Sequence, residues 1–223
     1  MKIAILTLFP EVFTSVFSSS ILKRAQDKKL ISIKLINIRG FARDKHRTVD
    51  DKPYGGGEGM VLKVDVVASA LESIKPKPYT ILLSASGKKY NHKIARNLAK
   101  KKNLAIISGH YEGVDARVEE FVDEVISIGD FILTGGEIPA MAIVDSVTRF
   151  IPGSINPKSA IDESFEKGLL EYPQYTRPEN FRGRKVPKIL LSGNHQKNAK
   201  WRESQSIKRT RKFRPDILKS KTG

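Results

Sequence analysis

Three short loops rich in glycine or serine each follow an apolar run, and this repeat limits the folds open to the chain. The loops cover residues 84–87, 109–113 and 129–136. Strand–loop–helix repeats of this spacing are typical of a parallel sheet with right-handed crossovers. Because the carboxyl ends of parallel strands lie at one edge of the sheet, the three loops should gather there, where such sheets bind ligands.

The rest of the N-terminal sequence agrees with an α/β fold. Periodicity predicts strands at 2–9, 31–38, 79–83, 104–107 and 125–128, and helices at 11–16, 21–28, 62–74 and 91–102. Residues 39–59 show no periodicity and include the run Gly55-Gly56-Gly57-Glu58-Gly59. A stretch of this kind is either a flexible hinge or a backbone platform for a substrate.

Residues 127–151 combine a glycine pair, a helix start and a helix end within one short segment. The Gly135-Gly136 pair permits close approaches that a Cβ would forbid, and Pro139 fits the first turn of a helix that ends near Arg149. Free backbone N–H groups beside such a turn can hold a small polar molecule. An ordinary buried strand–helix unit remains the alternative.

Charge indicates the class of partner. The formal net charge is +16, and residues 152–223 account for +10 of it, with 17 Lys/Arg against 7 Asp/Glu. Such an excess in one segment favours a polyanion such as nucleic acid, although a basic surface without a partner stays open. Cysteine is absent, which excludes disulfides and Cys-type zinc sites, and no apolar run is long enough to span a bilayer. These features predict a cytoplasmic protein with no membrane segment.

Several motifs are specific enough to indicate a family. They are SIGDFILTGGEIPA at 127–140, SGHYEGVDARV at 108–118, HRTVDDKPYGGGEGM at 46–60, SVTRFIPG at 146–153, GLLEYPQYTRP at 168–178 and VPKILLSGNH at 186–195. In these segments the chain resembles the bacterial tRNA (guanine-37-N1)-methyltransferases of the SPOUT class.

The resemblance implies an α/β fold of SPOUT type, a parallel sheet with helices on both faces and a deep trefoil knot, plus a small, mainly helical C-terminal domain. Residues 1–151 would form the knotted domain that binds S-adenosyl-L-methionine, 152–163 the interdomain linker, and 164–223 the small basic tRNA-binding domain.

The resemblance also implies which residues hold the methyl donor. They lie in the three glycine loops and the turn before the helix: Leu82, Leu83, Ser84, Gly87, Gly109, Tyr111, Glu112, Gly113, Ser127, Ile128, Gly129, Asp130, Phe131, Ile132, Leu133, Gly135, Gly136 and Pro139. The chain departs from the family's pattern at Ala85, where proline is usual, and at His110, where arginine is usual.

Two catalytic roles carry over from the family. Guanine N1 is a poor nucleophile until its proton leaves, so the reaction needs a general base and a cation near O6. The cation corresponds to Arg149. The base corresponds to Glu163, where the family carries aspartate; Asp162 is the alternative.

The same resemblance implies the partners. The chain would act as a homodimer with the active site between subunits, on the anticodon loop of tRNA. The bases around the target guanosine would be read by His46, Arg47, Asp50, Gly55, Gly56, Gly57 and Gly59. A loosely held Mg²⁺ is also associated with the family, although no carboxylate cage is evident in the sequence.

Three other functions compete with this one. A SPOUT methyltransferase acting on another RNA is the nearest, followed by a non-catalytic RNA-binding relative. A nicotinamide dehydrogenase is disfavoured because no G-x-G-x-x-G follows the first strand.

Overall fold

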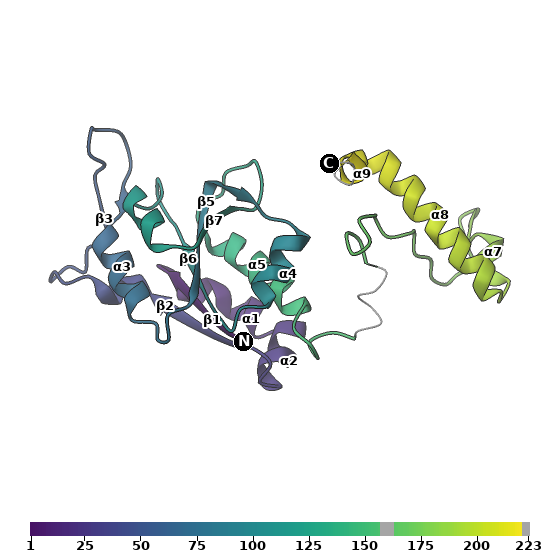
Figure 1. Ribbon diagram of the computed structural model, residues 1–223, viewed down its shortest axis with the longest axis horizontal. Helices are drawn as coiled ribbons and strands as arrows, with labels where there is room; N and C mark the ends of the chain where they lie inside the picture. The colour runs from purple at the N-terminus through teal and green to yellow at the C-terminus, as the bar shows by residue number, and fades with distance from the viewer. Residues whose placement is uncertain (157–162, 220–223) are drawn as a thin grey trace. The chain divides into compact units, whose positions relative to one another are not determined.

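The computed structural model describes residues 1–156 and 163–219, which fall into two compact units (Figure 1). The units cover Met1–Ile155 and Asn156–Gly223, and each is described here by itself. Residues 157–162, half of the predicted linker and including Asp162, lie outside the described residues.

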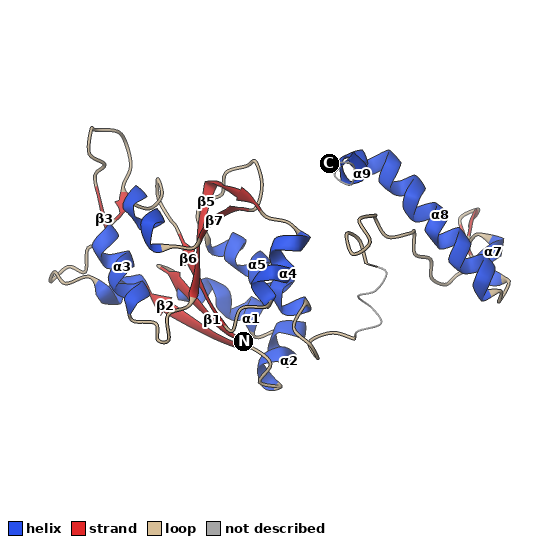
Figure 2. Ribbon diagram, in the orientation of Figure 1, coloured by secondary structure: helices blue, strands red, loops and turns tan. Residues whose placement is uncertain are grey.

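The N-terminal unit is built on a parallel sheet of five strands (Figure 2). The strands are β1 (Lys2–Thr7), β2 (Ser32–Asn37), β5 (Tyr79–Lys89), β6 (Asn103–Ser108) and β7 (Glu124–Ser127), in the order β2-β1-β6-β5-β7. Every neighbouring pair is parallel. The predicted α/β class is therefore confirmed, while the trefoil knot stays a prediction.

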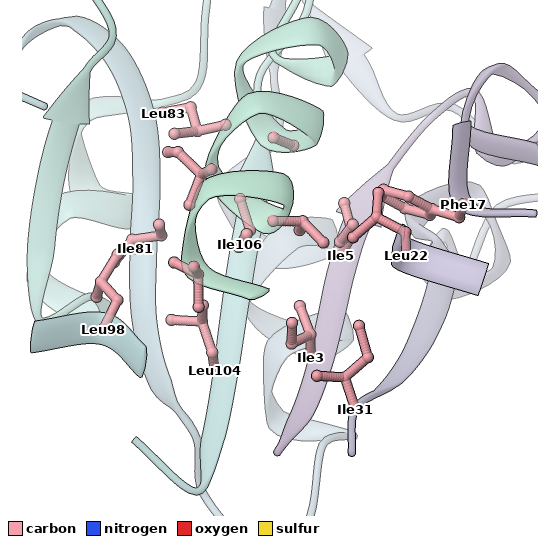
Figure 3. Close-up of a cluster of buried hydrophobic side chains, with 14 of the residues drawn as sticks. Ile3, Ile5, Phe17, Leu22, Ile31, Ile81, Leu83, Leu98, Leu104 and Ile106 are labelled. Atoms are coloured by element: carbon pink, nitrogen blue, oxygen red, sulfur yellow. The ribbon is translucent and has the colours of Figure 1, made fainter. Parts of the chain in front are cut away.

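Alternate residues of the central strands enter two separate cores. Ile3 and Ile5 of β1 face one core, and Ala4 and Leu6 face the other. Both faces of a parallel sheet are normally covered, which explains the nearly continuous apolar composition of these strands. The first core is shown in Figure 3, where Ile106 of β6 lies among side chains from the neighbouring strands and helices.

Helices cover both faces, as the fold class predicts. The first core includes residues of η1 (Pro10–Phe13), α1 (Thr14–Phe17), α2 (Ser20–Asp27), α4 (His92–Ala99) and α5 (Glu137–Arg149). The second includes residues of η2 (Ile38–Phe41), α3 (Val64–Glu72) and η3 (Ala116–Phe121). Asn91 begins α4 by accepting a hydrogen bond from the Ile94 N–H at 3.0 Å.

Strand β5 differs from its prediction. The sequence predicts a strand that ends at residue 83, but β5 continues to Lys89, and both Leu83 and Lys88 pair with Ile126 of β7. Residues 84–87 therefore bulge out of the strand. A Cβ on Gly87 would lie 2.5 Å from the backbone nitrogen of Ile126, so the strand can resume only because this residue is glycine.

The stretch predicted to lack regular structure is partly ordered. Helix η2 begins it, and β3 (Asp50–Asp51) pairs antiparallel with β4 (Val61–Leu62). This pairing closes residues 52–60 into a loop, called here the glycine strap. Strands β3 and β4 have only two residues each, which is too few to give a periodicity signal. The sequence therefore did not predict this pair of strands.

The C-terminal unit is mainly helical, with one short hairpin. The hairpin joins β8 (Asn180–Phe181) to β9 (Arg184–Lys185), and α7 (Lys188–Leu191), α8 (His195–Phe213) and α9 (Pro215–Lys219) follow. Asn194 caps α8 by accepting a hydrogen bond from the Lys197 N–H at 3.0 Å. The sequence predicted this start but extended the helix only to residue 204; α8 continues through the basic cluster at 208–213. Within the described residues, no helix is long and apolar enough to cross a membrane.

We predict that Tyr90 makes the stability of the protein depend on pH between about 10 and 12. Burial raises the pKa of Tyr90 to about 12, partly offset by the hydrogen bond between its hydroxyl and Ser146 at 2.6 Å. Unfolded tyrosine titrates near pH 10, so between these values the unfolded chain loses a proton that the folded protein keeps. The free energy of unfolding should therefore fall as the pH rises through this window.

The measurement is urea unfolding of wild type and Tyr90→Phe at several pH values from 8 to 12. The free energy of unfolding of the Tyr90→Phe variant should decrease less than that of wild type as the pH rises through this window. Tyr54→Phe is the control, because Tyr54 is fully exposed. Parallel curves for wild type and Tyr90→Phe would contradict the prediction.

Candidate functional site

The three glycine loops meet at the carboxyl ends of β5, β6 and β7, which are neighbours in the sheet. Together they enclose a cavity of about 240 Å³. The predicted donor-site residues that line it are Leu82, Leu83, Ser84, Gly109, Tyr111, Glu112, Gly113, Ser127, Ile128, Ile132, Leu133, Gly135, Gly136 and Pro139. The volume lies just below the range of about 300–1,000 Å³ that is common for ligand pockets.

Four predicted donor-site residues do not line the cavity. Gly87 packs against β7, and the carboxylate of Asp130 forms an exposed ion pair with Lys89 at 2.7 Å. The ring of Phe131 lies against Gly129 and is 55% exposed. Six lining residues were not predicted: Ala85, His110, Val114, Glu119, Ile126 and Thr134.

The cavity wall depends on backbone packing between two loops. The Gly136 N–H donates to the Gly109 carbonyl at 2.7 Å. A Cβ on Gly136 would lie 2.7 Å from the Cα of Ser108 and 2.9 Å from the nitrogen of Gly109. Only glycine can make this approach.

Tyr111 lies in the left-handed region, with a φ of +60°. Such a conformation is uncommon for a tyrosine and is found most often where a site fixes the backbone. The ring of Tyr111 packs edge-on against the ring of His110, with centroids 5.0 Å apart.

A buried carboxylate lies behind this wall. Glu137, the first residue of α5, is 6% exposed and accepts a hydrogen bond from the Thr7 hydroxyl at 2.8 Å. The N-terminus of a helix favours a negative charge. The Nδ1 atom of His110 is 3.7 Å from Glu137 Oε2, which is too far for a hydrogen bond. The sequence analysis missed Glu137; its position at the start of a helix after two glycines was the available signal.

The glycine strap is fastened to the cavity wall. The Glu112 N–H donates to the Met60 carbonyl, and the Leu62 N–H donates to the Gly113 carbonyl, both at 3.0 Å. A Cβ on Gly59 would collide with the Glu112 side chain. The structure thus brings the strap glycines next to the loop that carries Tyr111 and Glu112.

The strap is an unusual backbone segment. Gly55, Gly56, Gly57 and Gly59 all have positive φ, between +84° and +127°. A side chain at any of these positions would be strained, so the strap exposes backbone there rather than side chains. Lys52, Tyr54 and Glu58 are the exposed side chains of the strap, and Tyr54 is fully exposed.

The segment before the strap is ordered by one aspartate. Asp44 accepts hydrogen bonds from the Thr48 hydroxyl at 2.8 Å and from the Thr48 and His46 N–H groups at 2.9 and 3.2 Å. These bonds lower the pKa of Asp44 and keep its carboxylate charged, and the bond from the Thr48 hydroxyl contributes most. His46 and Arg47 are exposed beside it. Asp44 was not predicted, although an aspartate before such a turn is a familiar signal.

The predicted catalytic residues do not come together in one unit. Arg149 is the last residue of α5, whose first turn carries Pro139. The two are ten positions apart in the helix, which corresponds to about 15 Å along the axis. Glu163 belongs to the C-terminal unit. Across residues 1–156 and 163–219, no three His, Asp or Glu side chains gather as a metal site.

Comparison with known proteins identifies the family. The family model described as tRNA (Guanine-1)-methyltransferase TrmD matches residues 1–220. The chain belongs to this family. A tRNA (guanine-N(1)-)-methyltransferase of Carboxydothermus hydrogenoformans is 57% identical, over 98% of this chain and 88% of that protein. Those of Dictyoglomus turgidum and Geobacillus kaustophilus are 54% and 56% identical, over 98% of this chain and 90% and 91% of theirs.

The cavity is the predicted donor site, and one wall of it depends on the close contact at Gly136. We predict that Gly136→Ala weakens binding of S-adenosyl-L-methionine more than tenfold, because the added methyl group forces the loops at Ser108 and Gly109 apart. Isothermal titration calorimetry measures the affinity, and thermal unfolding reports the accompanying loss of stability. Gly40→Ala is the matched control, since a Cβ there meets nothing within 4 Å. Equal affinities for both variants would show that the loop contact does not shape the cavity.

Proposed function

We propose that this protein transfers a methyl group from S-adenosyl-L-methionine to N1 of the guanosine at position 37 of tRNA, next to the anticodon. Membership of the tRNA (guanine-1)-methyltransferase family supports the reaction and its class of substrate. The observation that carries the proposal for this chain is the cavity at the joined ends of β5, β6 and β7, formed by the loops in which the family holds its donor.

The donor site combines apolar walls with exposed backbone. Leu83, Ile126 and Leu133 offer apolar contacts for the donor, and the loops beside them offer amide groups. Walls of this composition, with a few polar groups to fix orientation, are typical of sites for small molecules. Backbone amides suit a donor that carries both a positive sulfonium and a carboxylate, because they add no net charge.

The reaction moves one methyl group and one proton. The guanine N1–H proton passes to a carboxylate, assigned to Glu163 with Asp162 as the alternative, and N1 then bonds to the methyl carbon as the carbon–sulfur bond breaks. The sulfonium becomes a neutral thioether. The negative charge that develops on guanine O6 is stabilised by a cation, assigned to Arg149. No step in this scheme uses a metal ion; a loosely held Mg²⁺ stays a prediction.

A homodimer with the site between subunits agrees with two features of the N-terminal unit. Arg149 is about 15 Å along α5 from the cavity, further than one side chain spans. Beside the cavity, Phe131, Ile132 and Ile138 are 55%, 81% and 56% exposed. Exposed apolar residues in such a group usually mark an interface. We infer that a second subunit covers them and supplies the missing cation.

Two regions are proposed to hold the RNA. The glycine strap, whose Met60 carbonyl accepts from the Glu112 N–H, would read the bases around the target guanosine together with His46, Arg47 and Asp50. The basic C-terminal unit would contact phosphates, which gives position rather than sequence. Action on tRNA also supports a location in the cytoplasm.

Methyl incorporation into tRNA tests the function. Unmodified tRNA transcripts with and without guanosine at position 37 are incubated with labelled donor, and the product is mapped by mass spectrometry. Transfer to N1 only in the first transcript is expected. Transfer to another RNA would favour a different SPOUT methyltransferase, and binding without transfer a non-catalytic relative.

We predict that Arg149→Ala removes most of the activity, at least a hundredfold in kcat, and leaves donor affinity within about twofold of wild type. The loss follows because the variant lacks the positive charge that stabilises guanine O6 in the transition state. Removing one such stabilising group typically lowers kcat by roughly 10²–10³-fold. Single-turnover kinetics and calorimetry separate the two effects. Unchanged turnover would refute the assignment.

A mixture of two impaired variants tests the subunit arrangement, at a donor concentration well below the Kd of the Gly136→Ala variant. If Arg149 serves the cavity of the partner, a heterodimer of Arg149→Ala and Gly136→Ala subunits contains one site with both defects and one with neither. Activity should then return on mixing. If Arg149 serves its own cavity, both sites stay defective and the mixture remains inactive.

We predict that Glu163→Gln loses at least tenfold in rate at neutral pH, because an amide cannot accept the N1 proton. The rate of the variant should recover as the pH rises and hydroxide replaces the carboxylate. Asp162→Asn is the matched control, one residue away. If only Asp162→Asn loses activity, Asp162 is the general base.

A further inference from the structure

The C-terminal unit contains a hollow of about 580 Å³ with no role in the proposal above. Its lining includes Tyr172, Tyr175, Arg177, Glu179, Asn198 and Arg202. This volume is within the range of about 300–1,000 Å³ of known ligand sites. All of these residues belong to a single unit, so the hollow exists without any contribution from the N-terminal sheet.

Two aromatic rings and two guanidinium groups line this hollow, those of Tyr172, Tyr175, Arg177 and Arg202. The guanidinium of Arg202 lies over the ring of Tyr172, 4.8 Å from its centroid. Tyr175 is 48% exposed and is backed by Trp201, with ring centroids 6.4 Å apart. Proteins that recognise single-stranded RNA stack unpaired bases on such aromatic rings and arginine planes.

Two polar groups of the hollow suit the donors of a nucleobase. Glu179 carries a carboxylate, and Asn198 Oδ1 is buried without a hydrogen-bond partner among the described residues. Both are acceptors and can receive the amino and imino N–H groups of a base. Arg177 and Arg202 also line the hollow and can donate to the base or to the phosphate attached to it.

A second hollow continues the first. It has a volume of about 410 Å³, shares Tyr172, Pro173 and Gln174 with it, and includes Arg209. The Nε of Arg209 is a buried donor with no hydrogen-bond partner in the described part of the chain. A donor in this position suits the phosphate or carbonyl oxygen of an adjoining nucleotide.

We propose that the hollow around Tyr172 and Tyr175 binds one unpaired nucleotide of the tRNA by stacking its base, as an addition to the phosphate contacts of the basic surface. The inference rests on the proposed function, since it takes tRNA as the ligand. It assigns part of the affinity to a base outside the donor cavity.

The test measures binding of an unmodified, end-labelled tRNA to the full-length protein by fluorescence anisotropy. Tyr175→Ala should weaken binding about tenfold, the scale expected for the loss of one stacked base. Tyr175→Phe keeps the ring and should bind as wild type does. Phe181→Ala is the matched control, because Phe181 is 55% exposed with Arg182 over its ring and does not line the hollow.

Salt dependence distinguishes stacking from charge. Loss of a stacked base should leave the slope of log K against log salt unchanged, because no phosphate contact is removed. A lower slope for Tyr175→Ala would overturn the proposal, as would binding equal to that of Phe181→Ala. A changed molar mass of Tyr175→Ala in light scattering would also overturn it, because the hollow would then hold a protein surface.

The outcomes separate this inference from the proposed function. If the inference alone fails, wild type and Tyr175→Ala both bind tRNA equally and both methylate guanosine 37. If the proposed function fails, wild type gives no N1-methylguanosine, and the binding data still decide the role of the hollow.

Discussion

The close contact between Gly136 and the loop at Ser108 and Gly109 organises the N-terminal unit. It joins the end of β6 to the start of α5 through a backbone hydrogen bond of 2.7 Å, with no room for any side chain. Helix α5 begins at this contact, which places Glu137 under the cavity wall and Arg149 at the distant end. The shape of the donor cavity and the distance to the proposed catalytic cation both follow from it.

The two units offer different chemistry to two different proposed ligands. The N-terminal unit forms its cavity from glycine loops and apolar side chains at a sheet edge, an arrangement suited to a small ligand. The C-terminal unit carries most of the excess positive charge together with Tyr172, Tyr175 and Trp201. Charge and aromatic rings suit a large, flexible polyanion whose bases can be unstacked.

The glycine strap is bonded to the loop that carries Glu112, so the two segments are mechanically connected. Backbone hydrogen bonds at Met60 and Leu62 connect the strap to the loop that lines the donor cavity. A displacement of the strap would therefore also move the cavity wall. Tyr111, with its φ of +60°, lies in the same loop.

The sequence by itself determined the α/β class, the order of the main strands and helices, and the gathering of three loops at one edge. These follow from local periodicity and from the rule that parallel strands end at a common edge. Family motifs then marked fourteen of the residues that line the cavity. Only the tertiary structure decided that Asp130 and Phe131 lie outside it, that Glu137 is buried behind it, and that residues 84–87 bulge from β5. Each of these depends on contacts between segments far apart in the chain, such as Thr7 with Glu137 and Gly87 with Ile126, and no local pattern records such contacts.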